Sequence, residues 1–498
     1  MKKGHQIRIG LALVILMLFV GLFKINSDKN KNTMGQTTYF TRSDMKSIQN
    51  DLKNNNFQAP EFNQKELLKN IPSATVYDES TGNNVALSVW DSWPVTDRNG
   101  AVANYHGYRL VIALTAKGER NDNGGSRLGL FAQKYSEKSN NIATWQYLGN
   151  IFNTFGEGSH NDSYLRRINS EWSGSTTLMN PDDTTLRVFY TNSMVTGEDQ
   201  SQALTTAKIF LEPKNGSWSQ GLEINHSKTT DHKTVFVGDG KIYQTVSQTS
   251  KKLNQTQDSF AMRDPHLVID GDKYYLIFEG NTGSKYGFQG ISNFNNKMYF
   301  GQESFFQKDR NRLLNNKNTT EYDKAFLANA SLGKIELNHD FTVKKVMKPV
   351  VAANATIDIL ERPNLFKYRG KWYFFTCFWG DSLASSDDRF KNKTYMFGYV
   401  SEDGINGKYK PLNGNGLVLR SNTKKGEANF TYSYLVVPPK DGKSDKFVIT
   451  SFEDDKSFAP SFVLKINDDK TKLINRYVLD QGALYDNGNH YKTSPQDN

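Results

Sequence analysis

The stretch RGKWYFFTCF (369–378) shows the pattern that decides the fold, a polar turn followed by aromatic and β-branched residues. Such runs between turn residues are typical of buried β-strands. The pattern recurs in HGYRLVIALTA (106–116), TTLRVFYTNS (184–193), GDKYYLIFEG (271–280) and SDKFVITSFE (444–453). We interpret each copy as an inner strand of one blade, which predicts an all-β fold, a five-bladed β-propeller. The copies start roughly 75 to 98 residues apart, a loose period, so a pair of packed β-sandwiches is the alternative.

Helices are expected mainly before these repeats. Residues 42–70 indicate two helical pieces, capped among residues 41–44 and interrupted at Pro60. A shorter helix is expected near 303–315 and in the region up to Leu327. The sequence therefore predicts one propeller catalytic domain over residues 41–490 with a short helical lead-in.

The beginning of the chain has the composition of an export signal. Three basic residues precede the apolar run IGLALVILMLFVGLF (9–23), which is short for a membrane-spanning helix and suits a secretory signal. No clear cleavage site follows, so residues 1–30 are expected to be a signal peptide or an uncleaved signal anchor. Residues 31–40 are polar and predict a disordered linker. The protein is expected to be secreted or held at the cell surface, with membrane anchoring by this segment as one possibility.

The net charge and the cysteine count argue against a nucleic-acid-binding protein and against a thiol enzyme. The formal net charge is +10, of which residues 1–30 contribute +4, and the rest shows no basic block. Nucleic-acid binding is therefore not expected. Cys377 is the only cysteine, so an exported chain of this kind has no internal disulfide, and its place in an apolar run argues against a catalytic thiol.

Three carboxylates stand beside apolar, strand-like runs. Asp91 lies in SVWDSWPV (88–95), Asp264 in MRDPHLV (262–268) and Glu361 in DILERPN (358–364). Glycosidic cleavage with retention needs a carboxylate nucleophile and a carboxylic acid that also acts as the base. A third carboxylate stabilises the positive charge of the transition state. Each acid taken alone could equally be a turn residue or an arginine partner.

Several motifs together resemble one family. VWDSWP, ANYHGY (103–108), EWSGS (171–175), RDPH (263–266), ERPN (361–364) and TYSY (431–434) are similar to motifs of the levansucrases and inulosucrases, the fructosyltransferases of glycoside hydrolase family 68. The likeness extends over about residues 40–485, in the same order. It implies a five-bladed propeller and activity on sucrose.

The resemblance implies roles for particular residues. Asp91 corresponds to the nucleophile, Glu361 to the acid/base and Asp264 to the transition-state stabiliser. Glu279 is expected to orient an arginine or a sugar hydroxyl, and Tyr432 to lie near the acid/base. The residues expected to line the sucrose subsites are Trp90, Trp172, Ser173 and Arg263.

Family members with the most similar pattern hold a structural calcium ion. All of the corresponding groups here offer oxygen, as Ca²⁺ requires. The resemblance therefore implies a calcium site, and no organic cofactor, with the ligands Asp258, Gln289, Leu327 through its carbonyl, Asn329 and Asp358.

Two positions depart from the family pattern. Ile359 stands where the family commonly has an acidic or amide residue, and Trp379 stands where similar levansucrases have an arginine. Both changes remove hydrogen-bonding groups from the side of the leaving group and acceptor. Trp379 offers a stacking face and one N–H donor instead.

The expected function is an extracellular, sucrose-cleaving fructosyltransferase of the levansucrase type. It would transfer fructose to a growing fructan, to sucrose or to water, and act as a monomer. The alternatives are a mainly hydrolytic β-fructofuranosidase, a propeller that binds sugar without catalysis, and a propeller that cleaves arabinans or other fructans with three acids.

Overall fold

The computed structural model describes residues 34–53, 57–118, 125–138, 141–196, 199–250, 252–454, 456–488 and 491–492. The expected signal segment lies outside these ranges, so the signal peptide or anchor stays a prediction. Within them, no helix is long and apolar enough to cross a membrane.

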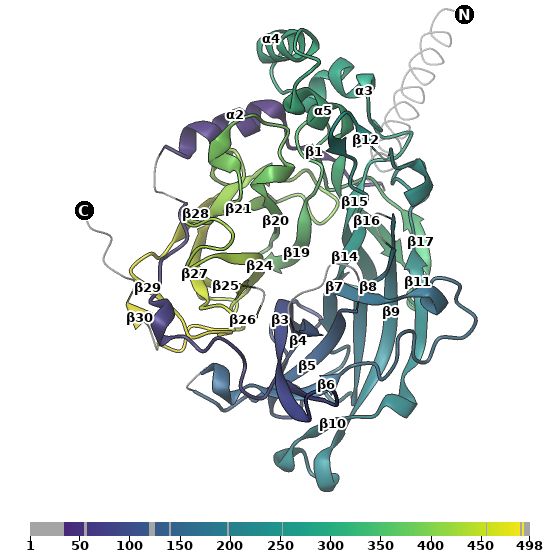
Figure 1. Ribbon diagram of the computed structural model, residues 1–498, viewed down its shortest axis with the longest axis vertical. Coiled ribbons are helices and arrows are strands. Elements are labelled where there is room, and N and C mark those ends of the chain that lie inside the picture. Colours follow the sequence, from purple (N-terminus) through teal and green to yellow (C-terminus); the bar gives the residue numbers. More distant parts are fainter. Residues whose placement is uncertain are drawn as a thin grey trace, which may run out of the picture.

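The described part of the chain is mainly β-sheet, as expected, and its strands follow one another in five antiparallel groups (Figure 1). The first group is β3 (Asn83–Thr96), β4 (Tyr108–Lys117), β5 (Arg127–Lys134) and β6 (Gln146–Asn150), with β2 (Thr75–Asp78) beside β3. The second is β7 (Ser170–Thr177), β8 (Thr185–Thr196), β9 (Asp199–Pro213) and β10 (Leu222–Ile224), with β11 (Thr230–Phe236) beside β9.

The three later groups repeat this order. The third contains β14 (Met262–Asp270), β15 (Lys273–Asn281), β16 (Ala330–Leu337), β17 (Val343–Val346) and β18 (Val351–Ala352). The fourth contains β19 (Glu361–Tyr368), β20 (Lys371–Trp379), β21 (Thr394–Ser401), β22 (Lys410–Pro411) and β23 (Leu417–Arg420). The fifth contains β24 (Thr431–Val437), β25 (Lys446–Glu453), β26 (Ser457–Phe458), β27 (Phe462–Asn467) and β28 (Lys470–Leu473). Two small ladders join β12 (Lys252–Leu253) to β13 (Thr256–Gln257) and β29 (Tyr477–Val478) to β30 (Tyr491–Lys492).

The first strands of the five groups contact one another in a cycle. Contacts connect β3 with β7, β7 with β14, β14 with β19, β19 with β24, and β24 with β3. Figure 1 shows these strands near the middle of the molecule, with β10, β17 and β28 further out. A short parallel pairing of β3 with β7, Val95 opposite Thr176, joins the first two groups into one sheet.

The repeated aromatic runs are the second strand of each group and not the first. They form β4, β8, β15, β20 and β25, each with neighbours on both sides. A strand in the middle of a sheet that is covered on both faces is apolar throughout. The strand before it, which faces the middle of the molecule, contains more polar residues, and it carries the three carboxylates.

The residues that lead into the first group are ordered from position 34. The expected disordered linker is therefore wrong for residues 34–40, because Thr38 and Tyr39 form β1 (Thr38–Tyr39), which pairs in parallel with Val351 and Ala352 of β18. Helix α2 (Arg42–Asp51) follows, and the Thr41 hydroxyl caps it. The second expected helical piece is reduced to one short turn over Gln64–Glu66.

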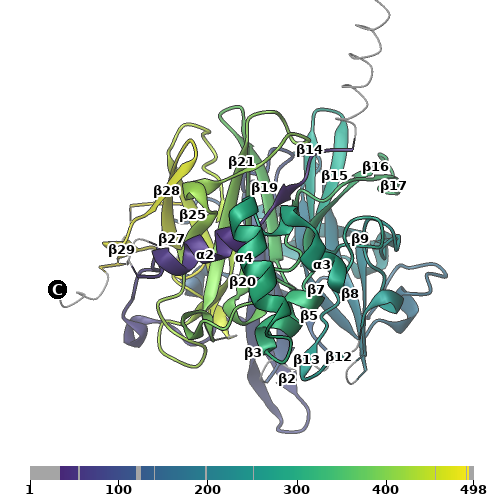
Figure 2. The same ribbon diagram turned by 90° about the horizontal axis from the view of Figure 1, so that it is seen from above.

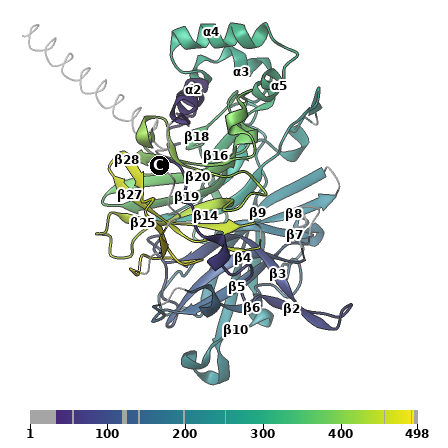
Figure 3. The same cartoon turned by 60° about the vertical axis from the view of Figure 1, so that its left-hand side comes forward.

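The other α-helices of the described residues form an insertion between β15 and β16. They are α3 (Ile291–Asn295), α4 (Glu303–Leu314), close to the helix expected at 303–315, and α5 (Thr320–Leu327). Figures 2 and 3 show α2 lying against α4. Arg42, which is 1% exposed, ion-pairs with Asp309 of α4 at 2.5 Å and with Glu321 of α5 at 2.7 Å. Its other amino group donates to the carbonyls of Ala355 and Ala384, so this one residue connects the lead-in to the insertion and to the third and fourth groups.

Candidate active site

A β-bulge interrupts each of the five first strands at or next to a predicted site residue. The pairing register shifts between Trp90 and Ser92, Trp172 and Gly174, Arg263 and His266, Glu361 and Asn364, and Tyr432 and Leu435. A bulge adds an unpaired residue and turns its side chain away from the regular alternation. The bulges in β3, β7 and β14 contain Asp91, Ser173 and Asp264, respectively.

Asp91 is half-buried and lies beside the second group. The hydroxyl of Ser173 donates a hydrogen bond of 2.6 Å to its Oδ2. Ser173 is followed by Gly174, where an added Cβ would lie 1.9 Å from the carbonyl oxygen of Phe189. Only glycine fits there, which explains the W-S-G order of the motif. Trp90, the neighbour of Asp91, is 3% exposed and packs in the core.

Asp264 is 7% exposed and has a positive φ of 55°. Its backbone N–H donates to the hydroxyl of Thr191 at 2.9 Å, and its Oδ2 accepts the N–H of Arg362 at 2.9 Å. Burial raises the pKa of Asp264; the charges of Arg263 and Arg362 oppose this, and the negative charge of Asp91 adds to it. The backbone of the fourth group thus fixes the carboxylate of the third.

Glu361 is the first residue of β19, and its side chain is 22% exposed. Arg263 donates to its Oε1 at 3.3 Å, and the Tyr432 hydroxyl donates to its Oε2. Arg263 also donates to Oε2 of Glu279 at 2.8 Å. Residues from the third, fourth and fifth groups therefore meet at this carboxylate.

Glu279 is fully buried and pairs with Arg263 without facing the open site. Burial raises its pKa well above the ordinary value, and the charge of Arg263 opposes this rise. For Arg263, burial lowers the pKa, but the surrounding carboxylates, Glu279 first, outweigh it and hold the pKa above its usual range. Glu279 therefore holds the guanidinium in place.

Two further aromatic side chains border the site. Trp172 is half-buried, and its indole N–H donates to the Ser170 hydroxyl at 2.9 Å. Trp379 is half-buried, with its ring centroid 4.7 Å from that of Tyr432 and 5.5 Å from that of Phe430. Tyr432 in turn contacts Glu361, so Trp379 is one side chain away from the predicted acid/base. Ile359 is half-buried two positions before that residue.

The sequence motifs contained two residues whose contribution was not foreseen. Arg362 donates to the carbonyl of Ser92 at 2.6 Å and lies over the ring of Trp93, connecting the fourth group to the first. Glu171 of the EWSGS motif is fully buried, accepts the N–H of Leu128 at 2.9 Å and pairs with Arg127 at 3.3 Å. Burial raises the pKa of Glu171 to about 7. Both residues stood in the recognised motifs, but their partners lie far away in the sequence.

The predicted calcium ligands come together next to the helical insertion. The amide nitrogen of Gln289 lies 2.7 Å from Oδ1 of Asp258, 2.7 Å from the carbonyl of Leu327 and 3.4 Å from Oδ1 of Asn329. Asn281 joins Asn329 to Asp358, donating to Oδ1 of Asn329 at 2.9 Å and to the carbonyl of Asp358 at 3.3 Å.

Two buried oxygen atoms of this cluster accept no hydrogen bond from any described residue. Within the described residues, Oδ1 of Asp358 and Oε1 of Gln289 are buried without a hydrogen-bond partner. Burial, together with the charge of Asp258, raises the pKa of Asp358, and burial raises the pKa of Asp258. Two desolvated carboxylates with unused oxygen suit a divalent cation.

Known proteins resemble this chain over nearly its whole length. The sequence profile of the family described as Levansucrase/Invertase matches residues 29–485. The levansucrase of Bacillus subtilis (strain 168) is 39% identical over 472 residues, which cover 92% of each chain. A protein of Geobacillus stearothermophilus named inactive levansucrase is 40% identical over 471 residues, again 92% of each chain.

Solved structures agree with the sequence comparison. A crystal structure of a levansucrase variant complexed with sucrose is 39% identical and superposes with a TM-score of 0.80, covering 91% of this chain and 98% of that one. Identity at this level over nine-tenths of the chain establishes common descent and a common fold. The chain belongs to the levansucrase/invertase family.

Proposed function

We propose that this protein is a fructosyltransferase that cleaves sucrose and passes the fructosyl unit to an acceptor. Family membership alone does not carry the activity, because one relative of equal similarity is named inactive. The observation that carries it is the set of three carboxylates, Asp91, Asp264 and Glu361, which come from three of the five first strands. Each is held by a hydrogen bond from another strand group, given by Ser173, Arg362 and Arg263, respectively.

In the first half of the reaction, a carboxylate oxygen of Asp91 attacks the anomeric carbon of the fructosyl unit. Glu361, in its protonated form, gives its proton to the bridging oxygen as the bond to that oxygen breaks. Glucose leaves, and the fructosyl unit remains as an ester on Asp91. Ser173 holds the attacking carboxylate in place, and Tyr432 and Arg263 do the same for Glu361.

In the second half, a hydroxyl group of the acceptor attacks the same carbon. Glu361, now a carboxylate, takes the hydroxyl proton, and the ester bond to Asp91 breaks. A sugar acceptor gives an extended fructan, and water gives free fructose. The configuration is inverted twice and is therefore retained overall.

The other residues bind the sugar and stabilise charge. The carboxylate of Asp264, fixed by the backbone of Arg362, accepts hydrogen bonds from fructosyl hydroxyls and stabilises the positive charge that develops on the ring. Trp90 and Trp172 form apolar walls on the fructosyl side, and Trp379 borders the acceptor side near Tyr432.

Product analysis after incubation with sucrose tests this function. Oligosaccharides or polymer together with an excess of free glucose support transfer. Equal amounts of glucose and fructose support the β-fructofuranosidase alternative, in which water is the main acceptor. The absence of sucrose cleavage by the folded wild-type protein would contradict both.

The five strand groups are further proposed to be the blades of a five-bladed β-propeller. The cycle of contacts among β3, β7, β14, β19 and β24 supports this arrangement, since five blades around a common axis would bring their first strands into such a cycle. The catalytic carboxylates then lie at one end of that axis.

A structural calcium ion is proposed at Asp258, Gln289, Leu327, Asn329 and Asp358. The oxygens that converge on the Gln289 amide and the unused oxygen of Asp358 support it. Bound there, a calcium ion would neutralise the two carboxylates and crosslink the loop before β14, the end of α5 and the loop before β19. Its contribution is to stability and not to the reaction.

The location and assembly proposed for the protein follow from the sequence. An exported, monomeric enzyme acting on external sucrose is consistent with the apolar run at 9–23 and the single cysteine. Cell fractionation and sedimentation of the full chain test these two points.

A further inference from the structure

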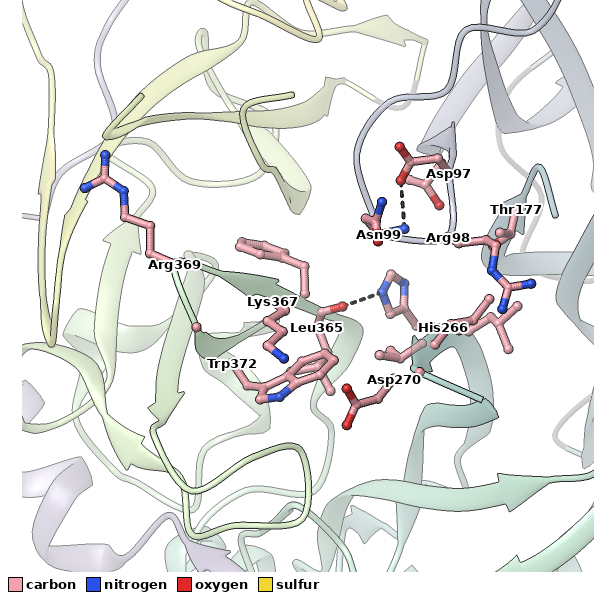
Figure 4. Close-up of a pocket in the computed structure, with 18 residues that line it drawn as sticks. Asp97, Arg98, Asn99, Thr177, His266, Asp270, Leu365, Lys367, Arg369 and Trp372 are labelled. Atoms are coloured by element: carbon pink, nitrogen blue, oxygen red, sulfur yellow. Dashed lines mark hydrogen bonds between the residues drawn. The ribbon is translucent and has the colours of Figure 1, made fainter. Parts of the chain in front are cut away.

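A cavity of about 440 Å³ lies at the ends of the first strands opposite to the catalytic carboxylates (Figure 4). It is bordered by Thr96 at the end of β3, Thr177 at the end of β7, residues 266–270 of β14 and residues 365–367 of β19. None of the residues assigned above to sucrose or calcium lines it. Small-molecule sites commonly have volumes of about 300 to 1,000 Å³.

His266 presents a hydrogen-bond acceptor to this cavity. Its Nε2 lies 3.1 Å from the carbonyl oxygen of Leu365, and a carbonyl only accepts, so Nε2 carries the proton. Burial lowers the pKa of His266 to about 4, so the ring is neutral at ordinary pH. Nδ1 is then an acceptor, and no described residue donates a hydrogen bond to it.

The other charged residues that line the cavity are Asp97, Arg98, Asp270, Lys367 and Arg369, and Oδ1 of Asp97 already accepts the backbone N–H groups of Asn99 and Ala101. Asp270 and Lys367 lie around the middle of the pocket in Figure 4, whereas the guanidinium groups of Arg98 and Arg369 extend away from it. Arg98 donates to the Tyr274 hydroxyl at 3.5 Å, and Arg369 donates to the carbonyl of Lys443. Asp270 forms no ion pair within the described part of the chain.

This balance of charges selects the class of ligand. The carboxylate of Asp270 disfavours an anion, and the ammonium group of Lys367 disfavours a simple cation. A neutral molecule with many hydroxyl groups can donate to Asp270 and to Nδ1 of His266 and accept from Lys367 at the same time. Carbohydrates meet this requirement.

We propose that this cavity is a second, non-catalytic carbohydrate site that binds fructosyl-containing oligosaccharides. That fructose is the sugar bound rests on the proposed function, since sucrose and fructans are then the carbohydrates the enzyme encounters. A chain held there would keep product or acceptor on the enzyme between reaction cycles.

The test uses the full chain with Asp91→Ala, so that sugars bind without being cleaved. Calorimetric titration with a short fructo-oligosaccharide is expected to show two sites per chain. Adding Asp270→Ala or Lys367→Ala should remove one site or weaken it at least tenfold, while the other site is unchanged. Adding Asp272→Ala, an exposed aspartate outside the cavity, should leave both sites intact.

A single site in the Asp91→Ala chain, or two sites that neither cavity substitution weakens, would overturn the proposal. Competition by inorganic phosphate or by Ca²⁺ at the second site would also overturn it, because the ligand would then be an ion. Circular dichroism of each variant establishes that it is folded. Sucrose cleavage by the wild type, measured in parallel, tests the proposed function separately from the second site.

Discussion

The hydroxyl of Ser173 on β7 donates a 2.6 Å hydrogen bond to Oδ2 of Asp91 on β3, so the proposed nucleophile is oriented by a residue of the neighbouring strand group. Each of the two residues lies in a β-bulge. The relationship thus depends on two local irregularities in two different pairs of strands.

Ser173→Ala is expected to lower kcat/KM for sucrose by roughly 10- to 100-fold. A hydrogen bond to a charged group is worth about 1.5–3 kcal/mol, and 1.4 kcal/mol corresponds to a factor of ten. Initial rates of glucose release over a range of sucrose concentrations measure it. Ser163→Ala, at an exposed serine, is the control, and equal rates for both variants would contradict the assigned role.

Trp379→Arg is expected to increase the affinity for sucrose and the ratio of transfer to hydrolysis. The substitution places a charged donor beside Tyr432 and Glu361, on the proposed acceptor side. One charge-assisted hydrogen bond to the sugar should lower KM about tenfold. Product ratios at fixed sucrose conversion measure it. Trp379→Phe keeps an aromatic ring and should not show the gain. A fall in transfer with the arginine would indicate that the indole itself holds the acceptor.

Glu279→Ala is expected to destabilise the protein by about 3–5 kcal/mol, because it leaves the largely buried Arg263 without its partner. Urea unfolding followed by tryptophan fluorescence measures the free energy of unfolding. Glu336→Ala removes a pair with the half-exposed Lys344 and should cost at most about 1 kcal/mol. Similar losses for both variants would show that the Arg263 pair has no special contribution.

Removing calcium with a chelator is expected to lower the melting temperature, and added Ca²⁺ should restore it. The gain from Ca²⁺ should grow as the pH rises, because Asp258 and Asp358, whose pKa values are raised, bind the ion only after losing their protons. Asp358→Asn should remove the response to calcium, and Asp403→Asn, at an exposed position, should keep it. A melting temperature unaffected by chelator would argue against the site.

The free energy of unfolding is expected to decrease in acid, because His232 is buried in its neutral form. Burial lowers the pKa of this residue to about 4, whereas in the unfolded chain it is about 6.5. The unfolded state therefore binds the additional proton between these values, so the contribution of His232 is complete above pH 6.5 and is lost as the pH falls toward 4.

The full loss for this residue is on the order of 3 kcal/mol. Unfolding free energies measured between pH 4 and 7 test it. His232→Gln, which can still bond Tyr190 and the carbonyl of Glu157, should flatten the slope over this range. The exposed His160→Gln should not, and an equal slope in all three proteins would refute the assignment.

The sequence predicted the strand content well because the second strand of each group is apolar on both faces. It did not predict the strand that precedes each of them, because these first strands carry polar residues and bulges that interrupt the period-two pattern. The three carboxylates were identifiable from their motifs. The contacts of Arg362 with Ser92 and Trp93 were not, since they join positions about 270 residues apart.

In the helical lead-in, too, the sequence predicts local structure but not contacts with distant residues. The capped helix at 42–51 has a local signal, and it was predicted. The order of residues 34–40 depends on β18 and on the buried contacts of Thr38 and Phe40, for which a polar local sequence gives no sign. Tertiary pairing thus decides the structure of this segment.

The pairing of β1 with β18 also has a consequence for the order of folding. Thr38 emerges from the ribosome well before its partner Val351, which is made more than 300 residues later. Contacts so distant in sequence close slowly, and here one partner does not exist until most of the chain has been synthesised. Strand β1 is therefore among the last parts of the fold to become fixed, and it stays unpaired with β18 while most of the chain is made.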